Sequence, residues 1–127
     1  MKFASILTAA LIAAAAAAPA KADPIKVGSK NFTEQYILGE MYAALLENAG
    51  YEVDRKINLG GTLIAHQALT TGEIDLYPEY TGTALSAVVK GEISSNPDAV
   101  YHTVQDYYAD ELGLVWLEPT GINNGYA

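Results

Sequence analysis

The pattern of hydrophobic and polar positions separates an apolar N-terminal run from a patterned remainder. The run from Phe3 to Ala18 follows Lys2, is dominated by alanine and, at about 16 residues, is shorter than the roughly 20 that span a bilayer. It is followed by Ala20-Lys21-Ala22, which has the small-x-small form of a signal-peptidase site. We therefore expect residues 1–22 to be a signal peptide that is cleaved after Ala22.

Apolar positions in the mature part recur at helical spacing. A helix is predicted from an N-cap at Thr33 to a glycine at Gly50. Its expected buried face consists of Ile37, Leu38, Met41, Leu45 and Leu46. Shorter helices are predicted over about 63–72 and 83–90. The triplet Asn96-Pro97-Asp98 combines a cap, a first-turn proline and a first-turn acid, and it predicts a helix that runs to Leu112.

Short apolar or alternating runs between these helices predict four strands, at about 25–28, 51–58, 73–77 and 114–117. The alternation of strands and helices predicts an α/β fold with a parallel sheet. Ligands of such sheets bind beyond the carboxyl ends of the strands. Gly60 and Tyr80 each follow one of these strands, so we expect both residues at the same edge of the sheet.

Composition narrows the classes of function. The chain has 127 residues, a formal net charge of −8 and no cysteine. This length is enough for one domain at most. The absence of cysteine excludes disulfides, thiolate metal sites and cysteine nucleophiles. The acidic excess argues against nucleic-acid binding, because phosphate neutralisation requires clustered Lys and Arg.

The titratable residues form no recognisable catalytic or metal-binding pattern. Asp75 and Glu79 flank the end of a predicted strand, and their spacing implies no paired carboxylates. His66 and His102 lie on different predicted helices. Ser29 has no His-Asp partner at a recognisable spacing, and the chain contains no G-x-S-x-G motif. We therefore expect no enzyme activity, no metal and no cofactor.

Two loops have compositions that suit ligand binding. Gly60-Gly61-Thr62 opens a helix, where free backbone N–H groups can hold an anion, although a tight turn without a ligand explains the glycines equally well. This loop lacks the spacing of nucleotide-binding loops. The loop Tyr77–Thr83 gathers aromatic and hydroxyl side chains after a buried strand. Tyr80 in this loop can present its ring face to a cation.

Four blocks of the mature sequence occur in a characteristic order: Lys26–Glu40, Asn58–Thr62, Gly72–Thr83 and Asn123–Ala127. Together they resemble the glycine betaine/choline-binding component of osmoprotectant ABC importers, and the resemblance extends over Ile25 to Ala127. It implies a class II periplasmic-binding-protein fold, in which two lobes close on a trimethylammonium ligand caged by aromatic side chains.

The resemblance also implies roles for single residues. Tyr80 and Tyr126 match cage tyrosines, and Thr83 matches a polar position that follows the first of them. Lys30 stands where some relatives carry a glutamine that contacts the polar end of the ligand. It therefore pairs either with a ligand carboxylate or with a nearby acidic residue. The complete set of predicted ligand-binding residues is Ser29, Lys30, Gly61, Thr62, Tyr80, Thr83 and Tyr126.

Members of this family are longer than this chain, which stops just after Tyr126, near the crossover into the second lobe. We therefore expect residues 23–127 to be the N-terminal part of lobe 1, truncated before the second lobe. The expected function is that of a monomeric, periplasmic solute-binding component for glycine betaine, choline or a related quaternary-ammonium osmoprotectant. ABC permease and ATPase subunits are the expected partners, and the permease is the only expected link to the membrane. Two alternatives remain open: a binding protein for another small solute such as an amino acid, or a truncated remnant that binds nothing.

Overall fold

The computed structural model describes residues 22–124. The signal-peptide prediction and Tyr126 therefore lie outside the described residues, apart from Ala22 itself. The elements in chain order are β1 (Ile25–Lys30), α1 (Thr33–Asn48), β2 (Val53–Gly60), α2 (Thr62–Thr70), α3 (Thr81–Ala84), a π-helical turn (Leu85–Val89) and α4 (Pro97–Leu112). None of the helices within 22–124 is both long enough and apolar enough to cross a membrane.

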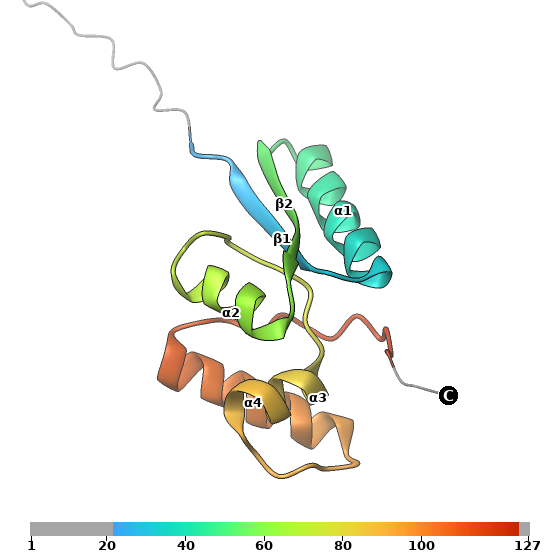
Figure 1. The fold of residues 1–127 in the computed structure, drawn as a ribbon, viewed down its shortest axis with the longest axis vertical. Coiled ribbons are helices and arrows are strands. Elements are labelled where there is room, and N and C mark those ends of the chain that lie inside the picture. Colours follow the sequence, from blue (N-terminus) through green and yellow to red (C-terminus); the bar gives the residue numbers. More distant parts are fainter. Residues whose placement is uncertain (1–21, 125–127) are drawn as a thin grey trace, which may run out of the picture.

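The sheet is a parallel pair of strands, β1 and β2, with α1 packed against it (Figure 1). The register pairs Ile25 with Val53 and, after an irregularity, Lys30 with Gly60. Parallel strands connected through a helix confirm the predicted α/β class. The register also places the ends of β1 and β2 side by side, which is where the candidate loops begin.

The predicted third strand is reduced to a single parallel bridge between Val27 and Leu76. The backbone N–H of Lys26 donates to the Asp75 carboxylate at 2.7 Å rather than to a backbone carbonyl. Pro78 then follows and has no N–H with which to continue a ladder. The chain therefore leaves the sheet at Leu76 and turns toward the ends of β1 and β2.

The predicted strand at 114–117 is wrong. This segment is extended but pairs with no strand among the described residues. It runs back along α4, where the Tyr101 hydroxyl donates to the Leu117 carbonyl at 3.3 Å. Trp116 packs edge-on against Tyr108, whereas Val115 is 81% exposed. The short apolar run that suggested a strand thus partly packs against one helix.

Helix α1 differs from the prediction in its cap and in its buried face. Phe32 is the N-cap and makes no side-chain cap bond, and Thr33 is the first helical residue. Of the predicted apolar face only Leu38 is buried, and Ile37, Met41 and Leu45 are more than half exposed. The buried side is formed instead by Gln35, Leu38, Gly39 and Ala43. Small residues let α1 approach the sheet closely: a Cβ on Gly39 would lie 2.8 Å from Ile57 Cδ1.

Helix α4 begins as predicted. The Asn96 side chain caps it by accepting from the N–H groups of Asp98 and Ala99, and Gly113 ends it in the left-handed conformation. The predicted 83–90 helix is α3 together with the π-helical turn. These elements share one core with α4, formed by the buried residues Ala84, Leu85, Val100, Val104 and Tyr108. In Figure 1, α3 and α4 lie together below the sheet, beyond α2.

Candidate functional site

Lys30, the last residue of β1, joins the loops that follow β1, β2 and the Leu76 bridge. Its ammonium donates to the Thr62 hydroxyl at 3.3 Å and binds the Glu79 carboxylate at 2.5 Å. The N–H of Asn31 also donates to the Gly60 carbonyl at 3.0 Å. These contacts confirm that Gly60 and the Tyr80 loop lie at the same edge of the sheet, and they bring the side chains of Lys30 and Thr62 together there.

Glu79 is the carboxylate around which the third loop is ordered. It accepts hydrogen bonds from the Lys30 ammonium, the Tyr77 hydroxyl and the Tyr80 backbone N–H. The side chains of Lys30 and Glu79 are only 4% and 5% exposed. A buried carboxylate requires such donors, because an unpaired buried charge is costly. Burial, reinforced by the charge of Glu79, raises the pKa of Tyr77, so Tyr77 is a neutral donor here.

Phe32 and Tyr80 form an aromatic pair beside this ion pair. Their rings are stacked, with centroids 6.2 Å apart and planes 24° from parallel. The Lys30 ammonium lies 5.6 Å from the Phe32 centroid and 5.0 Å from the Tyr80 centroid. Both distances are within the range of a cation–π interaction. The aromatic pair therefore already binds one positive charge, supplied by the protein itself.

The Tyr80 hydroxyl points toward polar groups of α1 and of the C-terminal segment. It donates to the Glu34 carboxylate, and the side chains of Gln35 and Asn124 lie near it. Burial, assisted by Glu34, raises the pKa of Tyr80, although Gln35 and Asn124 act in the opposite direction. Within 22–124 the fully buried amide nitrogen of Gln35 has no partner at hydrogen-bond distance. Its contact with Tyr80 is therefore a longer one, and one donor remains at the site.

The other predicted site residues behave differently. Ser29 is fully buried and links the strands, because its hydroxyl accepts from the N–H of Asn58 at 2.9 Å. Gly61 is the N-cap of α2, and its α-carbon faces open space. Thr83 lies within α3, and its hydroxyl makes no hydrogen bond to the other candidate side chains in the described part of the chain.

Sequence reasoning missed several members of this cluster: Phe32, Glu34, Gln35, Glu79 and Asn124. Phe32 lies in the loop after the first predicted strand, where sequence reasoning selected Ser29 and Lys30 but not this aromatic side chain. Glu79 was not named as a site residue, yet its place directly before Tyr80 and the acidic partner considered for Lys30 were usable signals. Glu34 and Gln35 were read as first-turn helix residues, and nothing local distinguishes that role from a contact with Tyr80.

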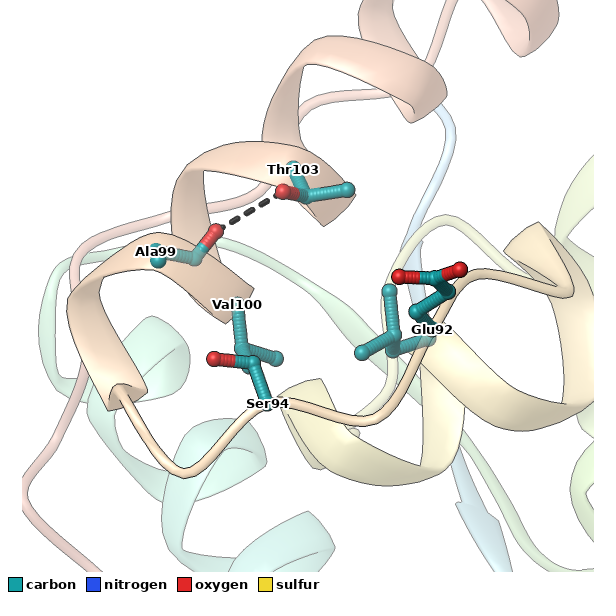
Figure 2. A pocket seen from close by; sticks show the side chains of 6 residues that line it. Glu92, Ser94, Ala99, Val100 and Thr103 are labelled. Carbon is teal, nitrogen blue, oxygen red and sulfur yellow. Dashed lines mark hydrogen bonds between the residues drawn. The ribbon is translucent and has the colours of Figure 1, made fainter.

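Two pockets lie away from the strand ends. The first, of about 230 Å³, lies between the loop before α4 and the first turns of α4 (Figure 2). It is lined by Leu85, Glu92, Ser94, Ala99, Val100 and Thr103. The hydroxyl of Thr103 donates back to the Ala99 carbonyl at 2.8 Å, so it offers little to a ligand. The second is an open apolar groove of about 470 Å³ on α1, beside Ile37 and Met41. Neither pocket contains a residue predicted to bind a ligand.

Comparison with known families and curated proteins gives a consistent result. A family model described as the substrate-binding domain of an ABC-type glycine betaine transport system matches residues 23–127. The glycine-betaine-binding protein of Pseudomonas aeruginosa is 42% identical over 113 residues, which is 88% of this chain and 35% of that protein. The ergothioneine transport permease/ergothioneine binding protein EgtU of Helicobacter pylori is 39% identical over 82% of this chain and 19% of its own length.

Solved structures agree on the fold. Apo YehZ from Escherichia coli matches with a TM-score of 0.75 and 38% identity, covering 81% of this chain and 37% of that one. A glycine betaine/carnitine/choline ABC transporter structure matches with a TM-score of 0.60 at 22% identity, covering 70% of this chain and 34% of that one, and shows a shared fold. The chain thus spans about a third or less of the length of these relatives.

Proposed function

The chain belongs to the family of substrate-binding domains of ABC-type glycine betaine transport systems, and on this premise we propose that it is the N-terminal part of a binding protein for a trimethylammonium solute. The family is a transport family, and the role proposed here is binding without catalysis. Permease and ATPase subunits of an importer are the partners that this role requires.

The observation that carries the proposal is the Lys30 ammonium seated against Phe32 and Tyr80. A pair of aromatic rings that holds one cation has the electrostatic character needed to hold another. A trimethylammonium group suits such rings because it is a bulky cation without N–H donors, and so it loses little hydration when it meets them. The loop edge of a parallel sheet is also the ordinary place for a ligand.

The relatives' names narrow the class of solute. One is a glycine-betaine-binding protein and another an ergothioneine binding protein, and a third is called a carnitine transport binding protein. These three compounds share a trimethylammonium group and a carboxylate. We therefore propose glycine betaine, carnitine and ergothioneine as the first ligands to test, together with choline, which has the trimethylammonium group but no carboxylate.

Three further proposals accompany this one. Residues 23–127 form the N-terminal part of lobe 1, residues 1–22 direct export, and the mature protein acts in the periplasm as a monomer. Among the predicted site residues we retain Tyr80, Lys30 and Thr62 on the contacts above. The binding roles of Gly61 and Thr83 are supported by the resemblance alone. The same holds for Tyr126, which lies beyond the described residues. Ser29 supports the site indirectly, because its hydroxyl links β1 to Asn58 of β2.

The test requires a protein of the family's full length. Residues 23–127 joined to the C-terminal remainder of the Pseudomonas aeruginosa relative give such a protein, called the completed protein below. Calorimetric titration with glycine betaine, carnitine, choline, ergothioneine and a set of ordinary amino acids should show binding of at least one trimethylammonium compound and none of the amino acids. Binding of an amino acid alone would assign the site to another solute class.

A further inference from the structure

We infer that Glu79 is the built-in counter-charge of the site: by neutralising Lys30, it allows a cationic ligand to bind the Phe32–Tyr80 pair. This inference rests on the proposed function and adds a specificity-determining residue to it. Nothing in the likeness to known proteins assigns a role to Glu79, and the sequence alone left open whether Lys30 pairs with a ligand carboxylate or with an acidic residue.

The first step concerns the charge of Lys30. Its ammonium is within 5.0–5.6 Å of both ring centroids, and its side chain is only 4% exposed. A ligand cation on the same rings must therefore come within several ångströms of a poorly solvated positive charge. Like charges at such distances repel strongly where the effective dielectric constant is well below that of water. With Lys30 unpaired, the aromatic pair would be a poor cation site.

The second step concerns the position of Glu79. Its Oε1 atom takes both the Lys30 ammonium at 2.5 Å and the Tyr80 backbone N–H at 2.8 Å, and its Oε2 atom takes the Tyr77 hydroxyl at 3.1 Å. The carboxylate thus cancels the charge of Lys30 at close range. The same contacts attach the Tyr80 backbone to the ion pair. Glu79 therefore both neutralises Lys30 and holds the Tyr80 ring in position.

The third step distinguishes the effect of the negative charge of Glu79 from its role in holding the loop in place. Gln in place of Glu79 keeps the shape and can still accept hydrogen bonds, but it leaves Lys30 uncompensated. Gln in place of Lys30 has the opposite effect, because a free carboxylate then lies beside the rings and attracts a cation. If Glu79 had a purely structural role, the two substitutions would not shift the preference for a cation in opposite directions. The two substitutions therefore test the charge directly.

The experiment measures two dissociation constants in the completed protein by NMR shift titration. One ligand is choline, and the other is its carbon isostere, in which a tert-butyl group replaces the trimethylammonium group. Their ratio reports how strongly the site favours charge at constant shape. Glu79→Gln should lower the preference for choline roughly tenfold or more. Lys30→Gln should raise the preference, and Lys30→Gln/Glu79→Gln should return it close to the starting value.

The controls keep the inference falsifiable. Glu73→Gln removes an exposed carboxylate outside the cluster and should leave the ratio unchanged. If Glu79→Gln alone fails to fold because Lys30 is left buried and unpaired, Lys30→Gln and the double variant still differ in charge at the site. An equal ratio in all folded variants would overturn the role of Glu79 while leaving the proposed function intact. A completed protein that binds none of the trimethylammonium compounds would overturn the proposed function and this inference with it.

Discussion

The Lys30 ammonium lies 5.0 Å from the centroid of the Tyr80 ring, although one residue ends β1 and the other precedes α3. The contact depends on the parallel register that brings the strand ends together and on the bridge that directs the chain from Leu76 toward them. The ring is therefore positioned by the fold before any ligand arrives. Such preorganisation lowers the cost of binding.

The first prediction concerns the Tyr80 ring. In the completed protein, Tyr80→Ala should weaken binding of the trimethylammonium ligand at least tenfold, because a desolvated cation–π contact contributes about 2 kcal/mol or more. Tyr80→Phe should retain most of the affinity, since it keeps the ring and loses only the hydroxyl, with its contacts to Glu34 and to the nearby Gln35 and Asn124. Tyr51→Ala removes an exposed tyrosine before β2 and is the matched control. An unchanged dissociation constant in Tyr80→Ala would remove Tyr80 from the site.

The second prediction concerns residues 23–127 by themselves. They should bind glycine betaine or choline only in the millimolar range or more weakly. Two solvent-exposed cation–π contacts supply about 1–2 kcal/mol, whereas micromolar affinity requires roughly 8 kcal/mol. Shift titration of the labelled fragment measures this affinity directly. Micromolar binding would mean that the described half-site suffices without a second lobe.

The third prediction concerns the pH dependence of stability. Burial lowers the pKa of His66, against the opposing charge of Glu79, and Nδ1 of its ring lies 3.5 Å from the Tyr108 hydroxyl. The unfolded chain, with a histidine pKa near 6.5, therefore takes up a proton more readily than the folded chain as the pH falls. The stability contributed by neutral His66 should be present above about pH 6.5 and lost below it.

Thermal unfolding of residues 23–127 at about pH 7.5 and pH 5.5 tests this dependence. His66→Asn keeps a polar group near the position of Nδ1 and should show a smaller loss of stability on acidification than the parent chain. His102→Asn changes an exposed histidine of α4 and should behave like the parent. Equal acid sensitivity in the parent and in His66→Asn would refute the assignment.

The fourth prediction concerns the cap of α4. Asn96→Ala removes the acceptor for two backbone N–H groups and should cost about 1 kcal/mol of unfolding free energy. In a domain of this size, that cost corresponds to a fall of about 4–8 °C in the unfolding midpoint. Asn96→Asp retains the acceptor beside the positive end of the helix dipole and should cost much less. Calorimetry measures the unfolding midpoints of the parent chain, Asn96→Ala and Asn96→Asp. Equal midpoints would show that the cap does not stabilise α4.

Local signals predicted the fold where the cause was local. The Asn96 cap and Gly113 agree with what adjacent residues dictate, and the parallel pairing of β1 with β2 follows from the strand–helix–strand order. The buried face of α1 did not follow from its apolar periodicity, because close packing selected Gly39 and Ala43 and left Ile37 and Met41 exposed. The segment around Val115 was predicted as a strand because a short run of apolar residues indicates partial burial, but such a run does not indicate a hydrogen-bonded partner strand.

The site was predicted only in part, because local signals identify single residues but not contacts between separate elements. Tyr80 and Lys30 were selected by motif and resemblance, and topology alone placed their loops at one edge. Glu79 required coordinates, because its importance lies in three donors that converge on it from β1, from Tyr77 and from the Tyr80 backbone. No spacing in the sequence reports that convergence.

The most direct test of the account is to observe which protons of the completed protein lie next to the ligand's N-methyl groups. Intermolecular nuclear Overhauser effects from the N-methyl protons of glycine betaine should reach the ring protons of Tyr80, and they should disappear in Tyr80→Ala. The same experiment would detect a ligand bound in the groove on α1, through contacts with the methyl groups of Ile37 and Met41. Contacts with Phe32 and Tyr80 are the predicted result, whereas contacts confined to the α1 groove or to the pocket near Val100 would contradict the assignment of the site.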